Sequence, residues 1–402
     1  MGFKLRIWGL SLLIAAAGCS ANEQEAPASK QNDSFWKTAS QERLAPVAER
    51  LAALETEITA PKYGNLDRLL IIHRNEVIAD IKRDVDYEAI TANENIRSHQ
   101  FNYQDPSWHP FYRGTELHTL QSITKSVTST AVGIAVTRGE FGDVAEMKVV
   151  DILGDAFEMP HRDERLEALT VHHLLTMRTG LPPENVEAAD DPNETGFPLE
   201  ESPDWVQFVL NDPMQATPDT AFEYHNGATQ ILGTILQIIT GVTLEDYAQE
   251  HLFKPLGIDA HYWKKTPAGR TDALGGLYLE AEDLAKVCKL MGEDGVWNGE
   301  RLLSSDWIKA ATASYSDDLP EDARHGGEET GYGYQWWKPL GFSETAFEGR
   351  GYGGNYLLCS PDDDLIVVQQ RWNPSGLPVF SGAENPYPVI KQRLRSEILP
   401  LL

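Results

Sequence analysis

Two strand-turn-strand patterns lie at opposite ends of this 402-residue chain, and they constrain its fold more than any other feature. The first covers residues 69–81, where apolar runs flank the polar segment 73–76. The second covers residues 355–369, where apolar runs flank the segment 361–364. Short apolar runs on either side of a turn predict β-hairpins. Because the chain between them is mostly helical in pattern, we expect one antiparallel sheet built from both ends, with a helical lobe inserted.

Four stretches carry the periodicity of helices. Residues 40–58 place apolar side chains at three- and four-residue steps, which predicts the first helix of the folded body. Residues 122–137 and 229–239 are predicted as buried helices that end at or near a glycine. The last helix is expected at about 386–399. The sheet should therefore be flanked by helices from both ends of the chain.

The first residues predict an export signal. Lys4 and Arg6 precede an apolar run, 7–17, that is too short to span a bilayer. The following Ala-Ala-Gly-Cys ends at Cys19 and resembles the lipobox of bacterial lipoproteins. The resemblance implies acylation of Cys19 and anchoring to a membrane, at the periplasmic face of a bacterial cell envelope. A secreted protein cleaved nearby is the alternative.

The predicted organisation has three parts. Residues after Cys19 are polar and without apolar periodicity, as in a disordered tether. The body that follows is expected to contain a sheet lobe and a helical lobe. The predicted bounds are 1–18 for the signal, 19–38 for the tether, 39–402 for the body, about 39–115 and 270–402 for the sheet lobe, and about 116–269 for the helical lobe.

Charge and cysteine content exclude several classes of partner. With 34 Lys and Arg against 61 Asp and Glu, the formal charge is −27, so nucleic acid is not expected as a partner. Three cysteines are too few for a disulfide scaffold, and no zinc spacing links them. The sequence contains no P-loop or dinucleotide glycine pattern. We expect no metal and no cofactor, and the oligomeric state is left open.

Ser122 opens an apolar helical segment and has Lys125 three residues later. Positions three apart share a helix face, so the amine and the hydroxyl should be neighbours. A neutral lysine can accept the hydroxyl proton, and a helix N-terminus stabilises an oxyanion. Residues 34–37 and 59–62 share the spacing, and a capping serine beside a surface lysine is the alternative interpretation. The apolar helix that follows favours Ser122 over the other two.

Tyr224 and Asn226 form the second candidate pair, immediately before the apolar segment 229–239. A phenol can relay protons, and a carboxamide can donate to a substrate carbonyl. Tyr63 and Asn65 have the same spacing, but they precede Ser122 and lead into a strand. Taken alone, Tyr224 also fits a packing tyrosine at a turn.

Together, Ser-Ile-Thr-Lys at 122–125 and Tyr-His-Asn at 224–226 resemble the serine β-lactamase-related family. This family includes class C β-lactamases, penicillin-binding carboxypeptidases, esterases and 6-aminohexanoate-oligomer hydrolases. The resemblance implies an α/β (α+β) fold of the β-lactamase/transpeptidase type, with an antiparallel sheet and a mainly helical inserted lobe. It also implies an acyl-enzyme mechanism with Ser122 as nucleophile, Lys125 as base, Tyr224 as proton relay and Asn226 as substrate-binding amide. The resemblance covers most of the chain through segments 169–181, 226–233, 252–258 and 331–337.

The third element of the family, Lys-Thr-Gly or His-x-Gly on an edge strand, is replaced here. The matching stretch, 349–356, reads Gly-Arg-Gly-Tyr-Gly-Gly-Asn-Tyr and looks more like the 6-aminohexanoate-dimer hydrolase and esterase branch. Glycines let a strand approach a substrate closely, so the N–H of Tyr352, beside Gly353, is the expected second oxyanion donor. A glycine-rich β-bulge is the alternative. Arg350 either supplies a substitute cation or points to solvent.

The sequence therefore predicts a serine hydrolase that acts on a small-molecule amide or ester. A β-lactamase or D-Ala-D-Ala carboxypeptidase is the alternative within the family, and a catalytically silent binding or sensor protein is the alternative outside enzymes. No Gly-x-Ser-x-Gly elbow exists, which disfavours an α/β-hydrolase. His172 and His173 lack a zinc pattern and are expected to be framework residues.

Overall fold

The computed structural model describes residues 35–92, 109–184, 198–316, 318–320, 329–373 and 378–402. The predicted signal, Cys19 and most of the predicted tether lie outside these residues. The last residues of that tether are packed, since Trp36 is 2% exposed and its Nε1 donates to the carbonyl of Glu282 at 3.0 Å. Strand β1 (Lys37–Thr38) then pairs in parallel with β3 (Glu76–Lys82). The folded body therefore includes Trp36.

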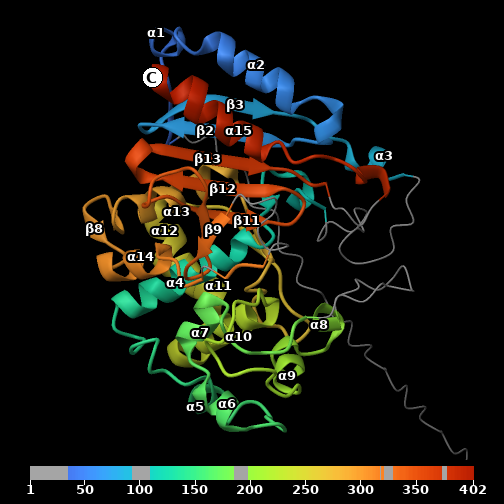
Figure 1. The fold of residues 1–402 in the computed structure, drawn as a ribbon, viewed down its shortest axis with the longest axis vertical. Helices are drawn as coiled ribbons and strands as arrows, with labels where there is room; N and C mark the ends of the chain where they lie inside the picture. The colour runs from blue at the N-terminus through green and yellow to red at the C-terminus, as the bar shows by residue number, and fades with distance from the viewer. Residues whose placement is uncertain (1–34, 93–108, 185–197, 317, 321–328, 374–377) are drawn as a thin grey trace, which may run out of the picture.

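The main sheet has eight strands in the order β1-β3-β2-β13-β12-β11-β10-β9, and every pair except β1 with β3 is antiparallel. Both predicted hairpins are present, and β13 of the second lies beside β2 of the first (Figure 1). The sheet is thus built from both ends of the chain, as predicted. The remaining strands are β2 (Arg68–His73), β9 (Glu329–Tyr332), β10 (Trp337–Pro339), β11 (Phe347–Gly351), β12 (Asn355–Ser360) and β13 (Leu365–Gln370).

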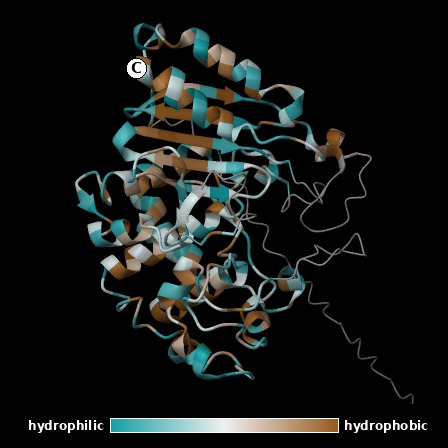
Figure 2. Cartoon of the chain, in the orientation of Figure 1, coloured by the Kyte–Doolittle hydropathy of each residue, from teal (hydrophilic) through white to brown (hydrophobic). Residues whose placement is uncertain are grey.

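Helices cover both faces of the sheet. All six residues of β2 are buried, with Leu69 and Ile71 in one core cluster and Leu70 and Ile72 in the other. Strands buried on both faces read as continuous apolar runs, and the central strands are accordingly brown in Figure 2. The covering helices are α2 (Ala48–Ile58) and α15 (Tyr387–Arg393) on one face, and α4 (Ile123–Thr137) and α13 (Ala281–Gly292) on the other.

Two predicted helices differ in detail. The stretch predicted as one helix at 40–58 is α1 (Gln41–Leu44) followed by α2, with Pro46 in the break. Proline lacks the amide hydrogen that a helix interior needs, which explains the interruption. The last helix continues beyond α15 as a wider π-helical turn (Leu394–Ile398). Each end of the chain still supplies the expected helical cover.

The inserted part is mainly helical and lies beneath the sheet in Figure 1. Helix α10 (Asn226–Thr240) begins three residues before its predicted start, because His225 caps it by accepting the N–H of Ala228. Within the described ranges, no single helix is long and apolar enough to cross a membrane; α10 and the segment Leu244–Leu256 meet that test only as a pair bent by 74°. The other elements are α3 (Tyr87–Ile90), α5 (Val149–Leu153), α6 (Glu164–Ala168), α7 (Val171–Thr176), α8 (Pro198–Glu201), α9 (Trp205–Leu210), α11 (Leu244–Ala248), α12 (Lys254–Leu256), α14 (Ser305–Thr312), β4 (His118–Thr119), β5 (Tyr262–Trp263), β6 (Leu277–Leu279), β7 (Val296–Trp297) and β8 (Glu300–Arg301).

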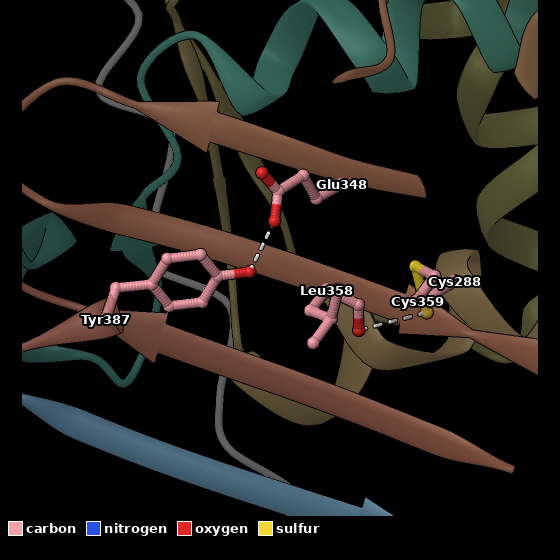
Figure 3. The surroundings of a disulfide bond; sticks show 5 residues. All are labelled: Cys288, Glu348, Leu358, Cys359 and Tyr387. Atoms are coloured by element: carbon pink, nitrogen blue, oxygen red, sulfur yellow. Dashed lines mark hydrogen bonds between the residues drawn. A yellow bond between two sulfur atoms is a disulfide. The ribbon is translucent and has the colours of Figure 1, made fainter. Parts of the chain in front are cut away.

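A disulfide joins Cys288 of α13 to Cys359 of β12 (Figure 3). The two cysteines are 71 residues apart in the sequence, and both are buried. The bond fixes a helix to the strand that it covers. Strand β12 also forms a hairpin with β11, in which Cys359 pairs with Phe347 at the end away from the turn.

Candidate active site

Ser122 lies at the junction between a strand and a buried helix. Strand β4 pairs with β6, and the chain then turns through Gln121, whose φ of +49° lies in the left-handed region. Ser122 follows as the first residue before α4, and thirteen residues of that helix are buried. The hydroxyl is therefore held by a short turn between two packed elements. Such constrained backbone is common at functional sites.

Lys125 lies against Ser122, as the three-residue spacing predicts. Its Nζ donates to Ser122 Oγ at 2.8 Å and to the carbonyl of Leu274 at 2.9 Å. The side chain is 1% exposed, so the amine is fixed between these two acceptors. With the amine neutral, the same short contact can carry the hydroxyl proton to nitrogen when Ser122 attacks a carbonyl. The contact with Leu274 was not anticipated from the sequence.

Tyr224 is the third group at this position. The amine of Lys125 lies over its ring, 5.1 Å from the centroid. Trp337 of β10 stacks on the ring with centroids 5.8 Å apart and an interplanar angle of 18°, and Tyr332 meets it edge-on at 6.3 Å. Trp337 belongs to the aromatic run 331–337, which the sequence marks only as framework, yet it orients the candidate proton relay.

Glycines let β11 pass close to the Ser122 turn. A Cβ placed on Gly351 would lie 2.2 Å from the carbonyl oxygen of Leu120, so only glycine fits there. Gly353 follows with a φ of +81°, in the hairpin turn that carries Tyr352. The expected oxyanion donor, the N–H of Tyr352, belongs to this turn; its role stays a prediction.

These elements enclose a cavity of about 520 Å³. A space of this size accommodates a small-molecule substrate. Its walls combine aromatic side chains with the hydroxyl of Ser122, the carboxylate of Glu223 and the guanidinium of Arg350. The lining includes Ser122, Tyr224, Trp337, Arg350, Tyr352 and Gly353.

Asn226 is hydrogen-bonded to a residue outside the predicted motifs. Its Nδ2 donates to Glu184 Oε2 at 2.7 Å, and the other oxygen of Glu184 accepts the N–H of Gly227 at 2.8 Å. Asn226 lines a neighbouring cavity of about 200 Å³ together with Glu184 and His225. Burial lowers the pKa of His225, and its Nδ1 accepts an N–H from Ala228, so this ring is neutral and its proximity to Glu184 is not an ion pair. The amide of Asn226 is thus engaged by Glu184, and its role toward a substrate stays a prediction.

Arg350 does not point to solvent, which removes one of its two predicted placements. The guanidinium is 6% exposed and forms an ion pair with the fully buried Glu348. The second oxygen of Glu348 accepts the hydroxyl of Tyr387 at 2.7 Å (Figure 3). The cation at the wall of the Ser122 cavity is therefore compensated by an internal carboxylate.

The histidine pair has structural partners. His172 Nδ1 lies 2.8 Å from the hydroxyl of Tyr334, and His173 forms the capping box of α7 with Thr170. Among the residues that the structure describes, no group of three or more His, Cys, Asp or Glu side chains could hold a metal ion.

Comparison with known proteins identifies the family. A family model described as Beta-lactamase matches residues 83–369. The chain belongs to the beta-lactamase family. This assignment agrees with the resemblance seen in the motifs, and the β-lactamase/transpeptidase-like fold predicted from them is confirmed.

Individual relatives are distant. The chain is 24% identical over 267 residues to a 6-aminohexanoate-dimer hydrolase of Paenarthrobacter ureafaciens, an alignment covering 63% of this chain and 65% of that protein. An octameric penicillin-binding protein homologue from Pyrococcus abyssi superimposes with a TM-score of 0.61 at 23% identity, covering 88% of this chain and 79% of the homologue. A family VIII carboxylesterase gives 0.61 at 14% identity, covering 92% of this chain and all of the esterase. These structural likenesses concern the fold.

Proposed function

We propose that this protein is a serine hydrolase that cleaves an ester or linear amide bond through an acyl-enzyme on Ser122. One observation carries the proposal: a buried lysine amine lies 2.8 Å from a serine hydroxyl that opens into a cavity of about 520 Å³. A catalytically silent binding protein would not need this serine and lysine in contact with a tyrosine beside them. Membership of the beta-lactamase family supports the same chemistry.

The steps follow from the geometry. Ser122 Oγ attacks the substrate carbonyl while Lys125 takes its proton. The N–H groups of Ser122 and Tyr352 are assigned to the oxyanion of the tetrahedral intermediate. Tyr224, beside the amine, relays the proton to the leaving alcohol or amine. Water then attacks the acyl-enzyme, releases the acid and returns the proton to Ser122.

The substrate class rests on what surrounds the serine. Strand β11 carries Gly-Arg-Gly where a carboxylate-binding lysine and threonine are expected, and its Arg350 is paired with Glu348. The amide of Asn226 is bonded to Glu184. Neither group supports recognition of a β-lactam. The names of two similar proteins, a 6-aminohexanoate-dimer hydrolase and a carboxylesterase, favour linear amides and esters.

The test is covalent labelling combined with a substrate panel. A fluorophosphonate should modify Ser122 in the wild type, and Ser122→Ala should lose both labelling and hydrolysis. Ser304→Ala is the matched control, because Ser304 also stands at the start of a helix, where it caps α14. Short-chain esters and linear amides should be cleaved better than penicillins, cephalosporins or D-Ala-D-Ala peptides. Full labelling of Ser122→Ala, or efficient turnover of a β-lactam alone, would refute the proposal.

We also propose that the protein is a lipoprotein held by Cys19 at the periplasmic face of a membrane. The support is the signal-like pattern before Cys19, together with the Cys288–Cys359 disulfide, since such bonds persist in oxidising compartments. Cys19→Ala should move the protein from the membrane fraction to a soluble or uncleaved form without loss of hydrolysis. Wild-type protein recovered in the soluble periplasmic fraction without detergent would contradict this.

A further inference from the structure

The direction of the Lys125 amine depends on a carbonyl that lies outside the sequence motifs. Besides Ser122 Oγ, Lys125 Nζ donates to the carbonyl of Leu274 at 2.9 Å. Leu274 lies in the loop 271–276, directly before strand β6. A shift of this carbonyl would move the amine relative to the serine. What holds the loop therefore bears on catalysis.

The side chain of Asp272 holds the loop from within. Its Oδ1 accepts the N–H of Leu274 at 3.1 Å and the N–H of Gly275 at 2.9 Å. A Cβ on Gly276 would lie 2.7 Å from Asp272 Cγ, so the carboxyl packs tightly against the backbone of the loop. The carbonyl of Asp272 itself accepts Trp263 Nε1 at 2.7 Å. The aspartate thus fixes the peptide that presents its carbonyl to the catalytic lysine.

Ala273, the residue after Asp272, is hydrogen-bonded to both α4 and α10. Thr128 of α4 donates to the carbonyl of Ala273 at 2.9 Å, and Gln230 of α10 accepts the N–H of Ala273 at 3.0 Å. Helix α4 also carries Lys125. Helix α4 therefore holds both the loop and Lys125. Within that loop, Asp272 sets the position of the Leu274 carbonyl.

Asp272 is a buried acid for which the proposed steps have no use. The residue is 7% exposed, and burial raises the pKa of its carboxyl, while the N–H groups of the loop and the charge of Lys264 oppose that rise. Lys264 lines the same small cavity of about 40 Å³. Burying a carboxyl is unfavourable unless hydrogen bonds or charges compensate it. Its retention at this loop points to a role there.

We propose that Asp272 is a positioning residue for Lys125: by holding the N–H groups of Leu274 and Gly275, it fixes the carbonyl that aims the amine at Ser122. The inference rests on the proposed function, in which Lys125 is the base. Asp272 touches no substrate in this scheme. Its removal should therefore slow the chemical step and leave substrate binding nearly unchanged.

The experiment compares Asp272→Ala with Asp272→Asn in the full chain, using ester hydrolysis and the rate of fluorophosphonate labelling per folded protein. A small misplacement of a catalytic group can reduce the rate about a hundredfold, so Asp272→Ala should lower kcat by about ten- to a hundredfold with KM changed less than about threefold. Asparagine keeps the acceptor oxygen and should restore kcat to within about fivefold of the wild type. If Asp272→Ala does not fold, Asp272→Ser replaces it, because a hydroxyl is a shorter and weaker acceptor.

Asp163→Ala is the matched control. Asp163 Oδ1 accepts the N–H groups two and three residues ahead, as Asp272 does, but it caps α6, far from the site in Figure 1. This variant should keep both kcat and the labelling rate. The inference is overturned if Asp272→Ala matches the wild type, or if Asp272→Asn is as slow as Asp272→Ala. Ser122→Ala distinguishes the failure of this inference from failure of the proposed function. If Ser122→Ala is inactive while Asp272→Ala is fully active, only the positioning role of Asp272 is refuted.

Discussion

Tyr224 and Asn226 are two residues apart, yet they line different cavities. Tyr224 lines the Ser122 cavity, between the amine of Lys125 and the ring of Trp337. Asn226 lines the neighbouring cavity, where its amide is bonded to Glu184. Glu184 binds both the amide of Asn226 and the N–H of Gly227, whereas the ring of Tyr224 contacts Lys125 and aromatic side chains.

The difference shows what spacing alone determines. His225 has extended backbone, and Asn226 begins α10, so the chain changes conformation between the two side chains. A partner 42 residues away, Glu184, then decides where the amide of Asn226 bonds. Sequence spacing thus identifies both groups but leaves the direction of each to partners distant in the chain.

The largest effect is expected from removing the disulfide between α13 and β12, which leaves the contacts of both cavities unchanged. Replacing Cys288 and Cys359 together by alanine should lower the free energy of unfolding by about 4 kcal/mol, because the bond closes a long loop in the unfolded chain. Chemical denaturation measures the change. A reducing agent should destabilise the wild type and leave the double variant unaffected. Equal stability of the two proteins would mean that the thiols are unpaired.

The second-largest effect is expected from substitutions in the proton path, Lys125 and Tyr224. Lys125→Ala and Tyr224→Phe should each lower kcat about a hundredfold or more, since proton transfer contributes that much to such reactions. Because the two groups share one path, the double variant should be little worse than the poorer single one. Ester hydrolysis under saturating substrate measures the three values. Multiplied losses would show that Tyr224 belongs to the packing of Trp337 and not to the proton path.

Much of this arrangement could be predicted from the sequence. The hairpins and the contact of Lys125 with Ser122 follow from local periodicity, because i and i+3 meet on any helix. The arrangement of the sheet lobe and the inserted helical lobe follows from the positions of the two hairpins and the helical patterns between them. In each case the signal lies within a few residues of the feature that it predicts.

What the sequence left open depends on contacts between distant segments. Nothing in the spacing of Cys288 and Cys359 indicates that they pair. Glu184 and Asp272 carry no motif, and their roles follow only from the hydrogen bonds that they accept after folding. Single polar residues in loops give no periodic pattern, so a fold-level prediction does not reach them.

Substitution of Asn226 tests whether its amide acts only in the neighbouring cavity or also on the substrate of Ser122. Asn226→Ala should lower kcat/KM for a short-chain ester less than about fivefold, because the amide lies outside the Ser122 cavity. The free energy of unfolding should fall by about 1–2 kcal/mol, since Glu184 loses a hydrogen-bond donor. Kinetics and denaturation on the same preparation measure both. A loss as large as that of Tyr224→Phe would show that the amide turns toward the substrate during catalysis.

The smallest effect concerns the charge at the wall of the Ser122 cavity. Removing Arg350 alone would strand the buried carboxylate of Glu348, so the informative variant replaces both, Arg350→Met with Glu348→Gln. Glutamine keeps an acceptor for the hydroxyl of Tyr387, and methionine keeps much of the length of the arginine side chain. The ion pair has no net charge, so the ratio of kcat/KM for a carboxylate-bearing ester to that for its neutral analogue should change less than about threefold. A tenfold loss confined to the charged ester would instead establish Arg350 as the substitute for the missing lysine. That outcome would also return carboxylate-bearing β-lactams to the list of plausible substrates, since the cation would then be available to them.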